Sequence, residues 1–89
     1  MLIAFIGGGN MATALVSGLV NPPRAHIQIR ISDPNEQARA HLAATFNVAT
    51  CSDNGAAVEG ADVIVLAVKP QIMPMVLEQL KGRVHKGQL

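Results

Sequence analysis

Three closely spaced glycines near the amino terminus form the segment of this sequence whose spacing predicts a specific chemistry. The pattern is Gly7-x-Gly9-x-x-Ala12. The intervening positions hold Gly8, Asn10 and Met11. Gly7 permits a tight turn, Gly9 lets the backbone approach a phosphate, and Ala12 allows close packing of the following helix. Because the first amides of a helix lack internal partners and carry partial positive charge, the loop predicts a pyrophosphate site.

The residues around this loop supply the context that the spacing requires. Leu2–Ile6 is a continuous apolar run, as expected of a strand buried on both faces of a parallel sheet. Asn10–Val20 has a helical period, with Met11, Leu15 and Leu19 four residues apart. The loop therefore ends a strand and opens a helix, as a dinucleotide-binding fingerprint does. The alternative is that these glycines only shape a strand-to-helix turn.

A carboxylate follows the second expected strand at the position where such folds contact the adenosine ribose. Asp33 lies 21 residues after Ala12, close to the spacing expected for a ribose ligand. It would accept hydrogen bonds from the ribose hydroxyls and repel a 2′-phosphate, which favours NAD. Ser32, Asn35 and Arg39 could hold a phosphate instead, so NADP stays open. A second alternative is that Ser32 and Asp33 only cap the next helix.

The rest of the chain alternates between strand-like and helix-like segments. We expect strands over residues 2–6, 27–31, 47–50 and 62–68, and helices over residues 10–20, 36–45, 55–59 and 72–80. Pro34 is expected at the first helical position of the second helix, and residues 52–54 are expected to cap the third. The alternation predicts an α/β fold: one Rossmann-type parallel sheet, of order 3-2-1-4, with helices on both faces.

The fourth expected strand raises a question about the extent of the domain. It is the most apolar strand of the chain, yet the predicted order places it at the edge of the sheet, where an apolar strand favours aggregation. We therefore expect residues 1–89 to be a dinucleotide-binding domain cut off before a fifth strand, with a further domain after Leu89.

Composition excludes several classes of function. The chain has 89 residues, a net charge of +1 and two phenylalanines as its only aromatic residues, so we expect no nucleic-acid partner. No apolar run approaches the ~20 residues of a membrane span. Cys51 is the sole cysteine, which excludes an internal disulfide and a cysteine metal cluster and suits a reducing cytoplasm.

No set of side chains in the sequence predicts a catalytic group or a metal site. His26, His41 and His85 lack a positioned partner and are interpreted as surface or packing residues. The four methionines are interpreted as core and gap-filling residues. Any catalysis is therefore expected to depend on a bound cofactor.

Two segments resemble the pyrroline-5-carboxylate reductase family. They are residues 3–12, ending in Gly-Gly-Gly-Asn-Met-Ala, and residues 66–71, Leu-Ala-Val-Lys-Pro-Gln. The Ser-Asp-Pro turn at residues 32–34 and Asn54 also resemble the family. This resemblance implies an oxidoreductase of proline biosynthesis, which reduces 1-pyrroline-5-carboxylate to L-proline with NADPH or NADH.

The resemblance also implies a role for each matching residue. The pyrophosphate would be held by Gly7, Gly8, Gly9, Asn10, Met11 and Ala12. Ser32 and Asp33 would face the adenosine ribose or its 2′-phosphate, and Asn54 would lie near the adenosine. The nicotinamide side of the cleft would be lined by Ala67, Val68, Lys69 and Pro70. Pro70 biases Lys69 toward extended backbone; apart from the resemblance, Lys69 is interpreted as a solvated lysine.

Family members often prefer NADPH and carry small polar residues after the second strand, a pattern from which Asp33 departs. The resemblance further implies a helical C-terminal domain that binds the substrate and forms a homo-oligomer, so this chain alone would bind cofactor but not catalyse. Two alternatives stay open: a β-hydroxyacid dehydrogenase domain, against which Lys69 and Pro70 argue, and a non-catalytic NAD(P)-binding module.

Overall fold

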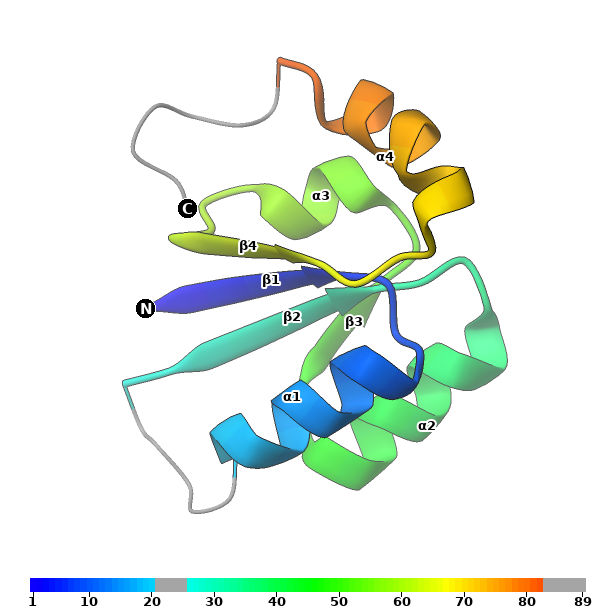
Figure 1. Ribbon diagram of the computed structural model, residues 1–89. Coiled ribbons are helices and arrows are strands. Elements are labelled where there is room, and N and C mark those ends of the chain that lie inside the picture. The colour runs from blue at the N-terminus through cyan, green and yellow to red at the C-terminus, as the bar shows by residue number, and fades with distance from the viewer. Residues whose placement is uncertain (21–25, 83–89) are drawn as a thin grey trace.

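A four-stranded parallel sheet with helices on both faces makes up the computed structural model, which describes residues 1–20 and 26–82 (Figure 1). The strands are β1 (Leu2–Ile6), β2 (Gln28–Ser32), β3 (Ala49–Cys51) and β4 (Val63–Leu66). The helices are α1 (Asn10–Val20), α2 (Glu36–Phe46), α3 (Asn54–Val58), the 3-10 turn η1 (Pro70–Ile72) and α4 (Met73–Leu80). The strand order β3-β2-β1-β4 confirms the predicted topology.

Strand β1 lies inside the sheet and contributes to both of its cores. Ile3 and Phe5 pack with residues of α1 and α2 on one face, whereas Ala4 and Ile6 pack with α3 and α4 on the other. Figure 1 shows these two helix pairs on opposite sides of the sheet. Successive side chains of a strand point to opposite faces. The apolar run Leu2–Ile6 therefore predicted correctly that this strand is covered on both sides.

Strand β4 forms an edge of the described sheet. It pairs with β1 from Ile3–Val63 to Ile6–Leu66, and all four of its residues are half-buried. The expected strand over residues 62–68 is longer than the observed one. The predicted position of this apolar strand at the edge is confirmed.

Helix α2 begins at Glu36 as predicted, but Pro34 is not its first helical residue. Pro34 precedes the helix, and Asn35 is the N-cap, with its side-chain oxygen accepting a hydrogen bond from the Ala38 amide at 3.0 Å. The helix therefore begins at Glu36, because the amide acceptor of Asn35 satisfies a first-turn donor that a proline cannot. The suggestion that Ser32 and Asp33 cap this helix is wrong, since Asn35 holds that position.

Helix α1 buries a different stripe from the one that its largest side chains suggest. Ala12 and Val16 are fully buried, whereas Met11 and Leu15 are 55% and 45% exposed. Small residues face the sheet because the helix lies close to it.

Met1 and Met75 are also exposed, at 61% and 58%, so the interpretation of the methionines as core residues is wrong for these positions.

Other boundaries shift by one or two residues for local reasons. Asn47 takes a left-handed conformation with φ 55° and ends α2, so β3 begins at Ala49 rather than at residue 47. Asp53 caps α3, which spans Asn54–Val58. Ile72 belongs to η1 and is 40% exposed. The predicted stop at residues 21–23 and the tail from residue 83 lie outside the described residues.

None of the helices within residues 1–20 and 26–82 has the length and apolar character that crossing a lipid bilayer requires.

Leu42 offers a test of the core between α2 and the sheet. Its side chain is 1% exposed, and we expect Leu42→Ala to lower the free energy of unfolding by about 2–5 kcal/mol through lost contacts and a cavity. Leu77, which is 52% exposed, provides the matched control, and Leu77→Ala should cost less than about 1 kcal/mol. Urea unfolding measures both, and equal losses would contradict the described core.

Candidate dinucleotide site

The candidate site lies where the carboxyl ends of β1, β2 and β4 meet, beside the start of α1 (Figure 1). The Gly7 amide donates to the Ser32 carbonyl at 2.8 Å, and the Ala67 amide donates to the Ile6 carbonyl at 2.8 Å. These two bonds extend the pairing of the strands into the loops. Because the order of strands reverses between β1 and β4, this edge is the position where ligands bind in open α/β sheets.

Gly7 has a conformation and a setting that only glycine fits. Its φ is +101°, and a Cβ atom built on it would lie 2.5 Å from the Ala67 carbonyl oxygen. That oxygen belongs to the backbone, so it cannot move aside as a flexible side chain could. The first glycine of the fingerprint is therefore required by the close approach of the loop after β4.

Gly8 turns its amide inward rather than toward the open end of the sheet. It donates to Asp33 Oδ2 at 2.9 Å, and a Cβ atom here would lie 2.7 Å from Leu42 Cδ1. The second glycine of the loop is thus packed against β2 and α2, and its amide is engaged within the protein.

Gly9 has open space on the side where a Cβ atom would be. Among residues 1–20 and 26–82, no atom lies within 4 Å of that position. The Gly9 carbonyl accepts hydrogen bonds from the Thr13 amide at 3.0 Å and from the Thr13 hydroxyl at 2.9 Å, which anchors the loop to the first turn of α1. A ligand can therefore approach the Gly9 backbone without displacing a side chain.

The first three amides of α1 supply hydrogen-bond donors beside this space. Helix geometry gives the amides of Asn10, Met11 and Ala12 no acceptor within the helix, and in the part of the chain that the structure describes none of them donates elsewhere. The side chains of Asn10 and Met11 are exposed, whereas Ala12 is fully buried against the sheet. This arrangement suits an anion such as a pyrophosphate.

Asp33 links the glycine loop to the turn before α2. Its Oδ2 accepts from the Gly8 amide, and its Oδ1 accepts from the Asn35 amide at 2.8 Å. Its own amide donates to the Cys51 carbonyl at 3.1 Å, and its carbonyl accepts from Arg39 Nη1 at 2.9 Å. The carboxylate is half-buried, so it is held at the end of β2 by bonds on both sides.

Ser32 and Asn54 occupy the layer beneath the site. Ser32 is fully buried, and its hydroxyl donates to Asn54 Oδ1. The Asn54 side chain in turn donates from Nδ2 to Gln79 Oε1 at 2.6 Å. Ser32 therefore holds the start of α3 rather than presenting its hydroxyl at the surface. Sequence reasoning missed Gln79, because nothing marks a glutamine in an amphipathic helix as the partner of a residue 25 positions away.

The segment after β4 forms the other side of the site. Ala67 and Val68 are half-buried, Lys69 and Pro70 are exposed, and Val68 Cγ1 lies 3.0 Å from the position of a Cβ atom on Gly7. Lys69 has φ −66° and ψ 147°, which confirms that Pro70 makes it extended. Ala67 and Val68 thus lie against Gly7, and Lys69 and Pro70 follow them at the surface.

His26 and His41 are exposed, which confirms their interpretation as surface residues, and His85 lies outside the described residues.

Comparison with known proteins identifies the family. Residues 2–89 match the family described as "NADP oxidoreductase coenzyme F420-dependent". The chain belongs to this family.

Curated members with similar sequences are named pyrroline-5-carboxylate reductase. The protein from Pseudomonas aeruginosa is 45% identical over 87 residues, which cover 98% of this chain and 32% of that protein. The one from Haemophilus influenzae is 48% identical over 81 residues, which cover 91% of this chain and 30% of that protein. The chain therefore spans about 30% of the length of these relatives.

Solved structures of the same enzymes share the fold. A pyrroline-5-carboxylate reductase from Coxiella burnetii aligns with a TM-score of 0.84 and 39% identity, covering 89% of this chain and 29% of the other. The pyrroline carboxylate reductase of Plasmodium falciparum, with NADP bound, aligns with a TM-score of 0.71 and 28% identity, covering 92% of this chain and 29% of the other.

Two alanine substitutions separate the roles of the glycines. We expect Gly7→Ala to lower the free energy of unfolding by at least about 2 kcal/mol, because it combines positive φ with a clash against Ala67. Gly9→Ala makes the same chemical change in open space and should cost less than about 1 kcal/mol. Thermal or urea unfolding measures both, and a larger cost at Gly9 would contradict the described loop.

Proposed function

We propose that this chain is the dinucleotide-binding domain of a pyrroline-5-carboxylate reductase, which reduces 1-pyrroline-5-carboxylate to L-proline with NADH or NADPH. The observation that carries the proposal is the open space at Gly9, bordered by unengaged amides of α1 at the switch point of the sheet. The relatives that bear this enzyme's name, and the NADP-bound neighbour among the solved structures, support it.

The residues present fit a dinucleotide. The backbone at Gly9 and the amides of Asn10, Met11 and Ala12 would hold the pyrophosphate, because they combine donors, partial positive charge and access. Asp33 lies at the end of β2, where the adenosine ribose binds in this fold. Asn54 accepts the hydrogen bond of the Ser32 hydroxyl, so it would support this end of the site from beneath.

The nicotinamide would lie toward β4, against residues 67–70. The bound cofactor supplies hydride transfer to the C=N carbon of the substrate. The part that this chain performs is positioning: Gly7 holds the loop against Ala67, and Pro70 keeps Lys69 extended at the rim. We place no acid–base group among the described residues, so protonation of the substrate nitrogen is assigned to water or to the rest of the protein.

We propose that the longer protein covers the open edge of β4 with a further strand and carries a second domain that binds the substrate and assembles the oligomer. Two observations support this division. The apolar residues of β4 are only half-buried, and this chain covers only 32% of the relative from Pseudomonas aeruginosa. Hydrogen exchange should then be slow at the outward amides of β4 in the full-length protein; exchange at the rate of exposed loops would contradict it.

The lone Cys51 supports a cytoplasmic location.

Gly9→Val tests the pyrophosphate site. The added side chain would fill the space at the mouth of α1, so we expect affinity for NADH and NADPH to fall at least about 100-fold with little loss of stability. Gly18→Val is the matched control, because Gly18 lies in α1, the helix that follows Gly9, and also has open space at its Cβ position.

Titration of nicotinamide fluorescence with the full-length protein measures both variants. Unchanged affinity in Gly9→Val, or equal losses in the two variants, would reject the loop as the site. Turnover of 1-pyrroline-5-carboxylate, followed by loss of reduced nicotinamide, tests the activity itself.

A further inference from the structure

We infer that Asp33 makes this protein bind NADH more tightly than NADPH, so that it selects the dinucleotide without a 2′-phosphate. The inference rests on the proposed function. It deepens that proposal by naming the form of the cofactor, which the sequence alone leaves open.

The carboxylate of Asp33 cannot easily turn away from a ligand. Oδ2 is bound by the Gly8 amide at 2.9 Å and Oδ1 by the Asn35 amide at 2.8 Å. Turning away would leave the half-buried Gly8 amide without its acceptor, and an unpaired buried donor is costly. The negative charge is therefore fixed at the carboxyl end of β2.

The same carboxylate retains capacity for a ribose. A carboxylate oxygen can accept two hydrogen bonds, and within the described part of the chain each oxygen of Asp33 accepts from one backbone amide. The 2′- and 3′-hydroxyls of an NADH ribose could both donate to the remaining lone pairs. A 2′-phosphate offers acceptors and negative charge in place of a donor, so it would be repelled.

Each of the three residues that could have offset this repulsion has a side-chain atom held by a contact within the protein. The Ser32 hydroxyl is buried and bonded to Asn54. The Asn35 side-chain oxygen caps α2 through the Ala38 amide. Arg39 directs Nη1 to the carbonyls of Asp33 and Pro34, at 2.9 and 3.5 Å, which holds its guanidinium against the backbone of the turn. These contacts leave the fixed carboxylate as the group that decides the preference.

The test compares the dissociation constants of NADH and NADPH in the full-length protein by fluorescence titration. We expect wild type to bind NADH at least about tenfold more tightly. In Asp33→Asn, which keeps an oxygen acceptor for Gly8 but removes the charge, the preference should fall at least about fivefold. Asp33→Ser, which removes the charge and replaces the carboxylate with a short hydroxyl, should abolish or invert it.

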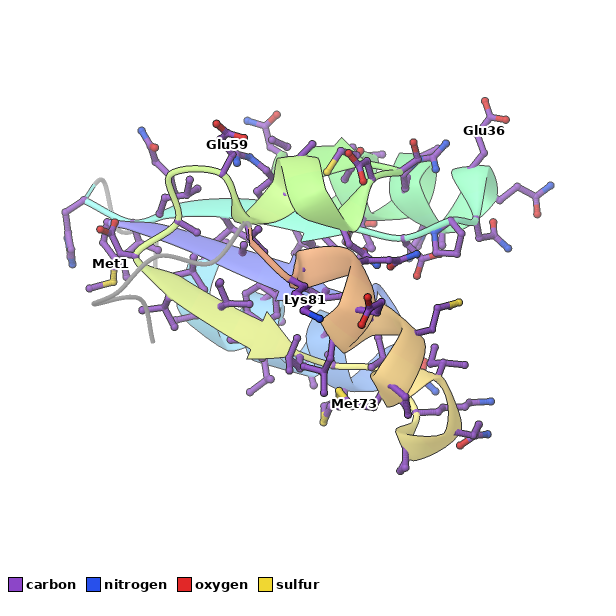
Figure 2. All side chains as sticks on the ribbon, turned by 90° about the horizontal axis from the view of Figure 1, so that it is seen from above. Met1, Glu36, Glu59, Met73 and Lys81 are labelled. Atoms are coloured by element: carbon purple, nitrogen blue, oxygen red, sulfur yellow. The ribbon has the colours of Figure 1, made fainter. Side chains whose placement is uncertain are left out.

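Glu36→Gln is the matched control. Glu36 lies in the first turn of α2, three positions after Asp33, and its side chain points outward from the protein (Figure 2). The substitution removes the same charge without touching the glycine loop, so the ratio of the two constants should change less than about twofold.

The inference would be overturned by equal or tighter binding of NADPH by wild type, by an unchanged ratio in both Asp33 variants, or by a shift in Glu36→Gln as large as that in the Asp33 variants. A loss of affinity for both dinucleotides by the same factor in Asp33→Asn and Asp33→Ser would also overturn it, because it would assign Asp33 a structural role only. Binding of neither dinucleotide by folded wild type is a distinct result, which would reject the proposed function.

Discussion

The close approach of the glycine loop to the end of β4 is the constraint on which the candidate site depends. A Cβ atom at Gly7 would lie 2.5 Å from the Ala67 carbonyl oxygen, so the two loops can meet only if residue 7 is glycine. This contact brings the segment that ends at Pro70 beside the mouth of α1. It also directs the chain so that Gly8 faces Asp33 and Gly9 faces open space. One steric requirement thereby places the two segments that are proposed to hold a dinucleotide side by side.

Burial explains how such a short chain holds this loop in place. Strand β1 supplies apolar side chains to both faces of the sheet. The loop that follows β1 is therefore anchored at one end by a strand that is buried on both faces. Asp33 and Leu42 then support the loop from β2 and α2, one by a hydrogen bond to the Gly8 amide and the other by packing. The open surface is confined to Gly9 and the exposed first residues of α1, where a ligand needs access.

The polar groups at the end of β2 divide into two layers. Ser32, Asn54 and Gln79 form a chain of side-chain hydrogen bonds that joins β2, α3 and α4. Above them, Asp33 joins the glycine loop to the start of α2. The lower layer fixes the helices relative to the sheet, and the upper layer carries the charge that a ribose would meet. Two adjacent residues of one strand end thus have separate tasks because successive side chains point to opposite faces.

The sequence by itself determined the parallel sheet, its strand order and the location of the glycine loop, because apolar runs and helical spacing report burial locally. It predicted that α2 begins at Glu36, but it did not determine that Asn35 caps this helix, nor the exposure of Met11 and Met75. Only the tertiary structure decided which of Ser32 and Asp33 is buried and which bonds the loop. That choice depends on partners 22 and 25 residues away, and no local pattern records contacts between segments so distant in the chain.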